Sequence, residues 1–336
     1  MSHNIAQPIH GFFQDYLSTQ RNLSPHTVLA CRDTLKLLVA FAARQLRKQA
    51  VELNVENFTA ALVRAFLDYL EKERGNSART RNARLAILHT FFQYLAFLDP
   101  RFMEQCQSVL GIPFKRREEP VLDYLERQEV RHIMQGINTA HTNSRRDEAA
   151  LRMLYNSGVR AQELVNLEIN DVHLSRPFYV RIRGKGYKER TCPLWPETIK
   201  ALKAYLVERH ANPGDRVPLF INAKGIRLSR FGLRYIVTQR VAAAAKSCPT
   251  LLARKVGPHT FRHTTAMHLL QSGIDLNMIR SWLGHSSIET THRYVEIDLD
   301  MKRRTLRACE RVLPASNQKG PSWNRDQGIL TWLARL

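Results

Sequence analysis

The first third of the chain repeats apolar side chains at the spacing of an α-helix, with short polar breaks between the repeats. Ser24-Pro25 has the form of a helix N-cap followed by proline at the first helical position, and apolar residues then recur three and four positions apart. The other predicted helices run through Phe12 to Leu17, from Phe58 to Tyr69 and from about Ser77 to Leu95. Residues 1–111 are therefore expected to form a mainly α-helical domain.

A segment at residues 112–120, IPFKRREEP, interrupts this pattern and is interpreted as a linker because two prolines enclose a run of charges. Residues 121–313 then mix helical periodicity with a strand signal, since Phe178, Val180 and Ile182 alternate with polar positions. Gly184-Lys185-Gly186 supplies a turn, and residues 188–194 are expected to return as a second strand. The second domain is therefore predicted to be mixed α/β and mostly helical.

Charge adds a candidate partner to this outline. The chain has 51 Lys and Arg against 30 Asp and Glu, a net charge of +21, which favours a polyanionic partner. The alternative is that the charge serves only solubility. No apolar run reaches membrane-spanning length, so no membrane partner is expected. The five cysteines are scattered and the N-terminus lacks a signal-peptide core, which predicts a cytoplasmic protein without disulfides or a zinc site.

Three arginines, Arg79, Arg81 and Arg84, fall in the first turns of the helix predicted from Ser77. Arginines at this density suit contacts with phosphate groups. A solvated helix face explains them equally well, so both interpretations stay open at this point.

Two segments of the second domain place polar residues where core packing does not explain them. In YNSGVRAQELVNL, residues 155–167, Gly158 can end one helix and Arg160 falls at the junction with the next, three residues before Glu163. In RGKGYKER, residues 183–190, Lys185 lies between two glycines at the hairpin tip, where its ammonium can reach a phosphate. Taken singly, each is more often an ordinary surface residue.

Two later segments add histidines, a second arginine and a tyrosine. In PHTFRHTTAMHLL, Pro258 suits a helix start, and His259 and Arg262 share a helix face. The spacing of His259 and His263 invites a zinc interpretation, but an HExxH motif would need glutamate at position 260, so we expect no metal site. In IRSWLGHSSIETTHRYV, residues 279–295, Gly284 ends a helix, His285 follows, and Tyr294 comes nine residues later.

Together these residue types can perform phosphoryl transfer. Two arginines can hold the non-bridging oxygens of a phosphate, histidines can bind it or shuttle a proton, and a lysine can protonate a leaving oxygen. A tyrosine hydroxyl can attack the phosphorus and hold the product as a phosphodiester. Such a set requires neither a metal ion nor another cofactor.

The order and spacing of these segments resemble the phage integrase, or tyrosine recombinase, family, and within it the Xer-like members. The resemblance covers residues 10–310, and it is specific because four motifs occur in order. These are SGVRAQEL, GKGYKERTCPL, HTFRHTTAMHLL and LGHSSIETTHRYV. It implies a SAM-like core-binding domain at residues 1–111, a linker at 112–120 and a catalytic domain at 121–313.

The resemblance also implies a role for each residue. Tyr294 would be the nucleophile, Arg160 and Arg262 would clamp the phosphate, and Lys185, with Lys188 as its rival, would be the general acid. His259 and His285 would bind the phosphate or assist proton transfer, and Glu163 would support Arg160. The resemblance further implies a duplex DNA site, a homotetramer on two such sites, alone or with related recombinases, and no additional arm-binding domain.

Other interpretations remain open from the sequence. The chain could pair DNA sites without cutting them, or relax supercoils as a type IB topoisomerase does, although the complete residue set and the two-domain pattern disfavour these alternatives. The target sequence, and the choice among integration, excision, transposition and resolution, are not determined. The tail at residues 314–336 carries an apolar strip that we expect to dock either on a neighbouring protomer or on its own domain: Ile329, Leu330, Leu333 and Leu336.

Overall fold

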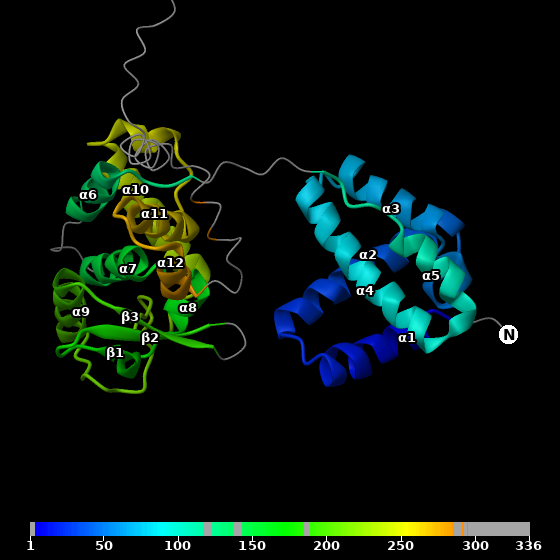
Figure 1. The fold of residues 1–336 in the computed structure, drawn as a ribbon, viewed down its shortest axis with the longest axis horizontal. Coiled ribbons are helices and arrows are strands. Elements are labelled where there is room, and N and C mark those ends of the chain that lie inside the picture. Colours follow the sequence, from blue (N-terminus) through cyan, green and yellow to red (C-terminus); the bar gives the residue numbers. More distant parts are fainter. Residues whose placement is uncertain are drawn as a thin grey trace, which may run out of the picture. The chain divides into compact units, whose positions relative to one another are not determined.

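The computed structural model of the protein describes residues 4–116, 123–136, 143–184 and 188–284, together with residues 291 and 294. The chain divides into two compact units, Met1–Pro120 and Val121–Leu336 (Figure 1). Each unit has a hydrophobic core of its own, so the two are described separately. Within these described ranges, no helix is both long and apolar enough to cross a membrane.

The first unit is helical, as its periodicity predicts. Its helices begin where hydroxyl side chains cap them, because Ser24, Thr59 and Ser77 each accept a hydrogen bond from a backbone N–H of the first turn. The segment after α1 is a π-helix. The helices span Ala6–Gly11 (α1), Phe12–Gln20 (π), Pro25–Leu46 (α2), Ala60–Lys72 (α3), Ala78–Leu98 (α4) and Met103–Leu110 (α5).

The start of the predicted linker packs on this first unit. Ile112 is buried in the core of the unit. The backbone of Lys115 exchanges two hydrogen bonds with the side chain of Asn82, and its ammonium lies 2.6 Å from a carboxylate oxygen of Glu71. Residues 112–115 therefore extend the helical unit rather than connect the units, and residues 117–120 lie outside the described ranges.

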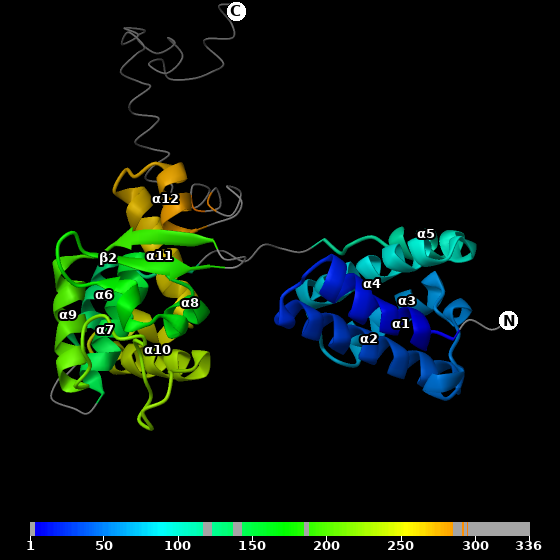
Figure 2. The ribbon, with the colours of Figure 1, turned by 90° about the horizontal axis from the view of Figure 1, so that it is seen from below.

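The second unit combines helices with a small antiparallel sheet, which lies at one edge of the unit in Figure 1, and Figure 2 views the molecule from that side. The strand order is β1-β2-β3, and the expected alternation is confirmed because Val180 and Ile182 are buried. The strands span Val172–His173 (β1), Tyr179–Arg183 (β2) and Glu189–Pro193 (β3). The helices span Arg127–Gln135 (α6), Ser144–Ser157 (α7), Ala161–Asn166 (α8), Pro196–Glu208 (α9), Arg230–Ala245 (α10), Pro258–Gln271 (α11) and Leu276–Leu283 (α12).

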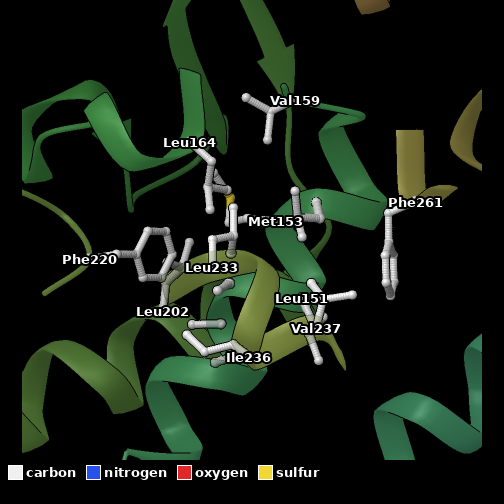
Figure 3. Close-up of a cluster of buried hydrophobic side chains, with 14 of the residues drawn as sticks. Leu151, Met153, Val159, Leu164, Leu202, Phe220, Leu233, Ile236, Val237 and Phe261 are labelled. Carbon is white, nitrogen blue, oxygen red and sulfur yellow. The ribbon is translucent and has the colours of Figure 1, made fainter. Parts of the chain in front are cut away.

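The core of this unit forms around α7, which contacts both α9 and α11. In the close-up of Figure 3, Leu151 and Met153 of α7 point among side chains of α10 such as Leu233 and Val237. Phe261 brings α11 to the same core (Figure 3). Burial on several sides fixes the direction of α7, and with it the loop that follows the helix.

A buried histidine lies where α11 meets α7. His268 is 6% exposed, and its Nδ1 lies 2.8 Å from the hydroxyl of Tyr155. Burial, reinforced by the positive charge of Arg127, lowers the pKa of His268 to about 4. The neutral ring therefore fits this site, and a protonated ring does not.

This site makes stability depend on pH. The folded state resists protonation of His268, so the unfolded state binds more protons between pH 6.5 and 4, and stability is lost as the pH falls through this window. Wild type should lose on the order of 3 kcal/mol more between pH 7 and 4 than His268→Gln, which keeps a hydrogen-bonding group but cannot titrate. Urea unfolding at both pH values measures this, and equal losses in the two proteins would contradict it.

Candidate active site

The loop after α7 brings the first candidate motif against the end of α12. Gly158 ends α7 with φ +58°, and its Cα lies against the side chains of Leu283 and Thr265. A side chain at this position would be strained by the backbone angle and would collide with Leu283. Glycine therefore allows the close approach of α7, α11 and α12 on which the site depends.

Glu163 connects three parts of the site. One of its oxygens accepts a hydrogen bond from Nη1 of Arg160 at 2.8 Å, and the other accepts from the Arg160 backbone at 3.0 Å. That second oxygen also accepts from Nη2 of Arg190 on β3 at 2.7 Å. Burial alone would raise the pKa of Glu163, but the hydrogen bonds and charge of Arg190, together with the hydrogen bonds of Arg160, outweigh it and hold this pKa below its ordinary range. The expected orienting contact with Arg160 is present.

Arg190 also fixes the end of α12. Its Nε donates to the backbone carbonyl of Trp282 at 3.1 Å, and its side chain lies against Gly284. Arg190 therefore connects the β-hairpin to the carboxylate of Glu163 and to the end of α12, after which the chain continues to His285.

Arg262 is 4% exposed and lies at the C-terminal ends of two helices. It donates to the carbonyl of Gly158, the C-cap of α7, at 2.6 Å and to the carbonyl of Leu283, the last residue of α12, at 2.8 Å. The partial negative charge of a helix C-terminus stabilises a cation there. Burial, together with the charge of Arg160, lowers the pKa of Arg262 to about 9, so the guanidinium is still charged at neutral pH.

The site has more positive than negative charge. Arg160, Arg190 and Arg262 contribute three positive charges against the one negative charge of Glu163, an excess of two among these four side chains. Side chains in a partly desolvated cluster of this sign favour an anion such as a phosphodiester. The part of the chain that the structure describes holds no group of three His, Cys, Asp or Glu side chains that could hold a metal ion.

Tyr294 lies beside α11 with its ring enclosed by apolar side chains. It is 2% exposed and packs in a cluster with Ala266, Met267, Leu270, Ile279 and Leu283. Its hydroxyl lies 2.9 Å from Nδ1 of His263. Tyr294 shares this cluster with Leu283, whose backbone carbonyl accepts a hydrogen bond from Arg262, and this connects the tyrosine to the arginine cluster.

His259 is exposed at the start of α11 and close to the same cations. Partial removal of its ring from water, together with the positive charges of Arg262 and Arg160, lowers the pKa of His259. The structure thus brings together five of the predicted residues: Arg160, Glu163, His259, Arg262 and Tyr294. Lys185 and His285 lie outside the described residues, so their predicted roles stay predictions.

The three arginines at the start of α4 differ in exposure. Arg79 is exposed and Arg84 is partly buried, but Arg81 is 7% exposed. Arg81 lies 3.8 Å from Glu71 and donates to the carbonyl of Pro113 at 3.4 Å. The guanidinium of Arg81 therefore joins α3, α4 and the chain after α5, a position that favours neither of the two interpretations left open for it, a phosphate contact or a solvated face.

Two residues of the site, Arg190 and His263, were missed by the sequence interpretation. Arg190 stands opposite Ile182 in the strand register and two residues before the buried Cys192, which places a charge at a core-facing position. The alternation of core-facing and outward-facing positions along β3 could therefore have identified Arg190 from the sequence. His263 was considered only as a metal ligand, and its contact with a tyrosine 31 positions later had no local signal.

A second surface of this unit has exposed aromatic and cationic side chains. Phe231 is 80% and Tyr235 66% exposed, one turn apart on α10, with Arg230 and Arg234 exposed beside them. Nucleic-acid bases stack on aromatic side chains, and guanidinium groups bind phosphates. This face is a candidate nucleic-acid interface distinct from the arginine cluster.

Comparison with known proteins defines the class. The model of the phage integrase family matches residues 123–300, and that of the phage integrase N-terminal SAM-like domain matches residues 12–97. The chain therefore belongs to the phage integrase family of site-specific tyrosine recombinases. This confirms the predicted fold class of a SAM-like helical domain followed by a mixed α/β catalytic domain.

The relatives extend over nearly the whole chain. It is 38% identical to y4rC of Sinorhizobium fredii, provisionally named an integrase/recombinase, over 99% of this chain and 98% of that protein. It is 31% identical to the tyrosine recombinase XerC of Pelobacter propionicus, over 92% of this chain and 96% of the relative.

Solved structures share the fold at low identity. The Tn1549 transposon integrase in complex with a circular intermediate DNA matches with TM-score 0.68 and 17% identity, covering 92% of this chain and 100% of that one. The XerH site-specific recombinase bound to a palindromic difH substrate matches with TM-score 0.65 and 22% identity, covering 86% and 82%.

The bridge made by Arg190 can be tested through its coupling to Glu163. Arg190→Gln should lower the free energy of unfolding by about 3 kcal/mol, because it leaves a buried carboxylate with fewer cationic partners. Adding Glu163→Gln should cost less than the sum of the two single changes, since the residues are in direct contact. Arg145→Gln, which removes an exposed ion pair with Glu208 in the same unit, should cost under about 1 kcal/mol. Urea unfolding of the four variants measures this, and additive losses would contradict the bridge.

Proposed function

We propose that this recombinase cleaves and rejoins duplex DNA through a covalent bond between Tyr294 and the 3′-phosphate of the cut strand. The observation that carries the proposal is the position of Tyr294, which shares a buried cluster with Leu283, whose carbonyl accepts a hydrogen bond from Arg262 of the positively charged cluster. A phenol can act as a nucleophile toward phosphorus, and the cluster supplies the charge that a phosphodiester requires.

In this proposal the two arginines act on the phosphate. Arg160 is more accessible, with 38% of its side chain exposed, and one of its nitrogens is oriented by Glu163. Arg262 is held by two backbone carbonyls, so little reorganisation accompanies the reaction. Guanidinium groups fixed before the substrate arrives can stabilise the charge that develops on the non-bridging oxygens.

Lys185 would then protonate the 5′ oxygen as it leaves. The proposal rests on its position in the loop between β2 and β3, and Lys188 remains the rival on the same hairpin. His259 and His285 would bind the phosphate or assist proton transfer. His259 is suited to this because its lowered pKa keeps a neutral ring available near neutral pH.

The partner proposed for this chemistry is a specific duplex DNA site, bound by four protomers on two sites. A DNA partner is supported by the complexes of the Tn1549 integrase and of XerH, and by the exposed aromatic and cationic face of α10. The biological task proposed is integration, excision or transposition of a mobile element, supported by the names of the integrase relatives. Pairing of DNA sites without cleavage and relaxation of supercoils remain the alternatives that the next experiment separates.

Covalent trapping tests the nucleophile. Nicked duplexes from the DNA flanking the gene should give a protein–DNA adduct on a denaturing gel, and Tyr294→Phe should abolish it because phenylalanine cannot attack phosphorus. The phenyl ring keeps the apolar packing of Tyr294, so folding should be retained. Tight binding with no adduct would favour the site-pairing alternative. Relaxation of plasmids that lack any specific site would favour the topoisomerase alternative.

The arginines of α4 give a separate test of DNA binding. Arg79→Ala should weaken binding to all sequences alike and reduce the slope of log K against log salt by about one, as loss of one phosphate contact does. Arg81→Ala is the matched control, since this buried residue should affect the stability of the first unit rather than the salt slope. Salt titrations of binding measure both, and an unchanged slope in Arg79→Ala would remove that residue from the interface.

A further inference from the structure

The contact between His263 and Tyr294 has no role in the chemistry described so far. The two residues are 31 positions apart, and the contact joins a side chain of α11 to the hydroxyl of a tyrosine that packs in an apolar cluster. We infer that His263 is a catalytic residue: its Nδ1 accepts the phenolic proton of Tyr294 as the Tyr294 oxygen attacks the scissile phosphorus. This inference rests on the proposed function, because it requires Tyr294 to be the nucleophile.

The geometry suits a proton acceptor. The distance from Nδ1 of His263 to the tyrosine oxygen is 2.9 Å, which is within the range for direct proton transfer. With its own proton on Nε2, the imidazole offers the Nδ1 lone pair to the phenol. The two rings are 5.9 Å apart between centroids and tilted by 53°.

The surroundings of the pair favour the negative charge that proton transfer leaves on the Tyr294 oxygen. The positive charge of Arg262 attracts a negative charge on the Tyr294 oxygen, which favours a phenolate as the proton leaves. His263 is only partly buried, so its side chain keeps some contact with water. Tyr294 is 2% exposed and its oxygen is already in contact with His263, which makes the histidine a nearer acceptor than bulk solvent.

Other ionisable groups near this pair have separate positions. On α11, His259 precedes His263 by one turn and is close to Arg160. On α7, Tyr155 bonds to His268, which is five residues further along α11 than His263. Arg280 lies on α12, which also packs against α11. Of these groups, His259 is the competitor for the same proton, and the experiment is designed to separate the two histidines.

The proposed step balances as follows. The bond from the Tyr294 oxygen to phosphorus forms, the O–H bond breaks and its proton goes to Nδ1 of His263. The bond from phosphorus to the 5′ oxygen breaks with its electron pair, and that oxygen takes a proton from the general acid, proposed to be Lys185. Rejoining reverses each transfer, so the enzyme returns to its starting protonation state.

Single-turnover adduct formation between pH 6 and 9.5 tests the inference, on the nicked duplex that wild type cleaves. His263→Asn keeps a polar atom near the Nδ1 position but cannot take a proton. It should react roughly 10²-fold more slowly than wild type at pH 7, and its rate should rise about tenfold per pH unit as hydroxide replaces the base. His259→Asn, matched in chemistry on the same helix, should lose activity without this recovery at high pH.

A second substrate separates the base from the acid. A duplex with sulfur in place of the 5′ bridging oxygen has a leaving group that needs no proton, so it should restore Lys185→Ala but leave His263→Asn slow. DNA binding and urea unfolding check that His263→Asn is folded, and His263→Gln is used in its place if His263→Asn does not fold. A wild-type rate and pH profile in the folded variant, or restoration by sulfur, would overturn the inference. Absence of any Tyr294-dependent adduct in wild type would overturn the proposed function itself, and the inference with it.

Discussion

The architecture of the catalytic unit depends on one buried cation at the ends of two helices. Arg262 donates to the C-cap carbonyl of α7 and to the last carbonyl of α12, two groups that helical hydrogen bonding leaves without partners. Burying a guanidinium is costly, and here the two helix C-termini offset that cost. The same contacts hold together the loop that carries Arg160 and the segment that leads to His285.

Around this cation, one carboxylate orients the other charges. Glu163 binds Arg160 from its own helix and Arg190 from the hairpin, and Arg190 in turn binds the carbonyl of Trp282 on α12. The elements that carry Arg160, Arg190 and Arg262 are therefore joined to one another by charged hydrogen bonds, which are stronger and more directional than neutral ones. The consequence is a set of guanidinium groups positioned before any phosphate binds.

Much of this arrangement could be predicted from the chain alone. The caps at Ser24 and Ser77, the turn at Gly158 and the helix start at Pro258 are local features that depend on residues within one turn of each other. The contact of Arg160 with Glu163 follows from their spacing at a helix start. The burial of Arg81 could not be predicted, because exposure depends on what packs over a helix: its partners are Glu71 and Pro113, on other segments.

The sequence by itself determined the two-domain division into helical and mixed α/β parts, the family, and the residue types available for phosphoryl transfer. Periodicity, capping and motif order are properties of neighbouring residues, so they can be read without coordinates. Only the tertiary structure decided that the buried Arg262 joins the ends of α7 and α12, that Arg190 bridges the hairpin to α12, and that His263 contacts Tyr294. These contacts join residues that are 21 to 92 positions apart in the sequence. Such residues meet only when the apolar faces of α7, α11 and α12 pack together.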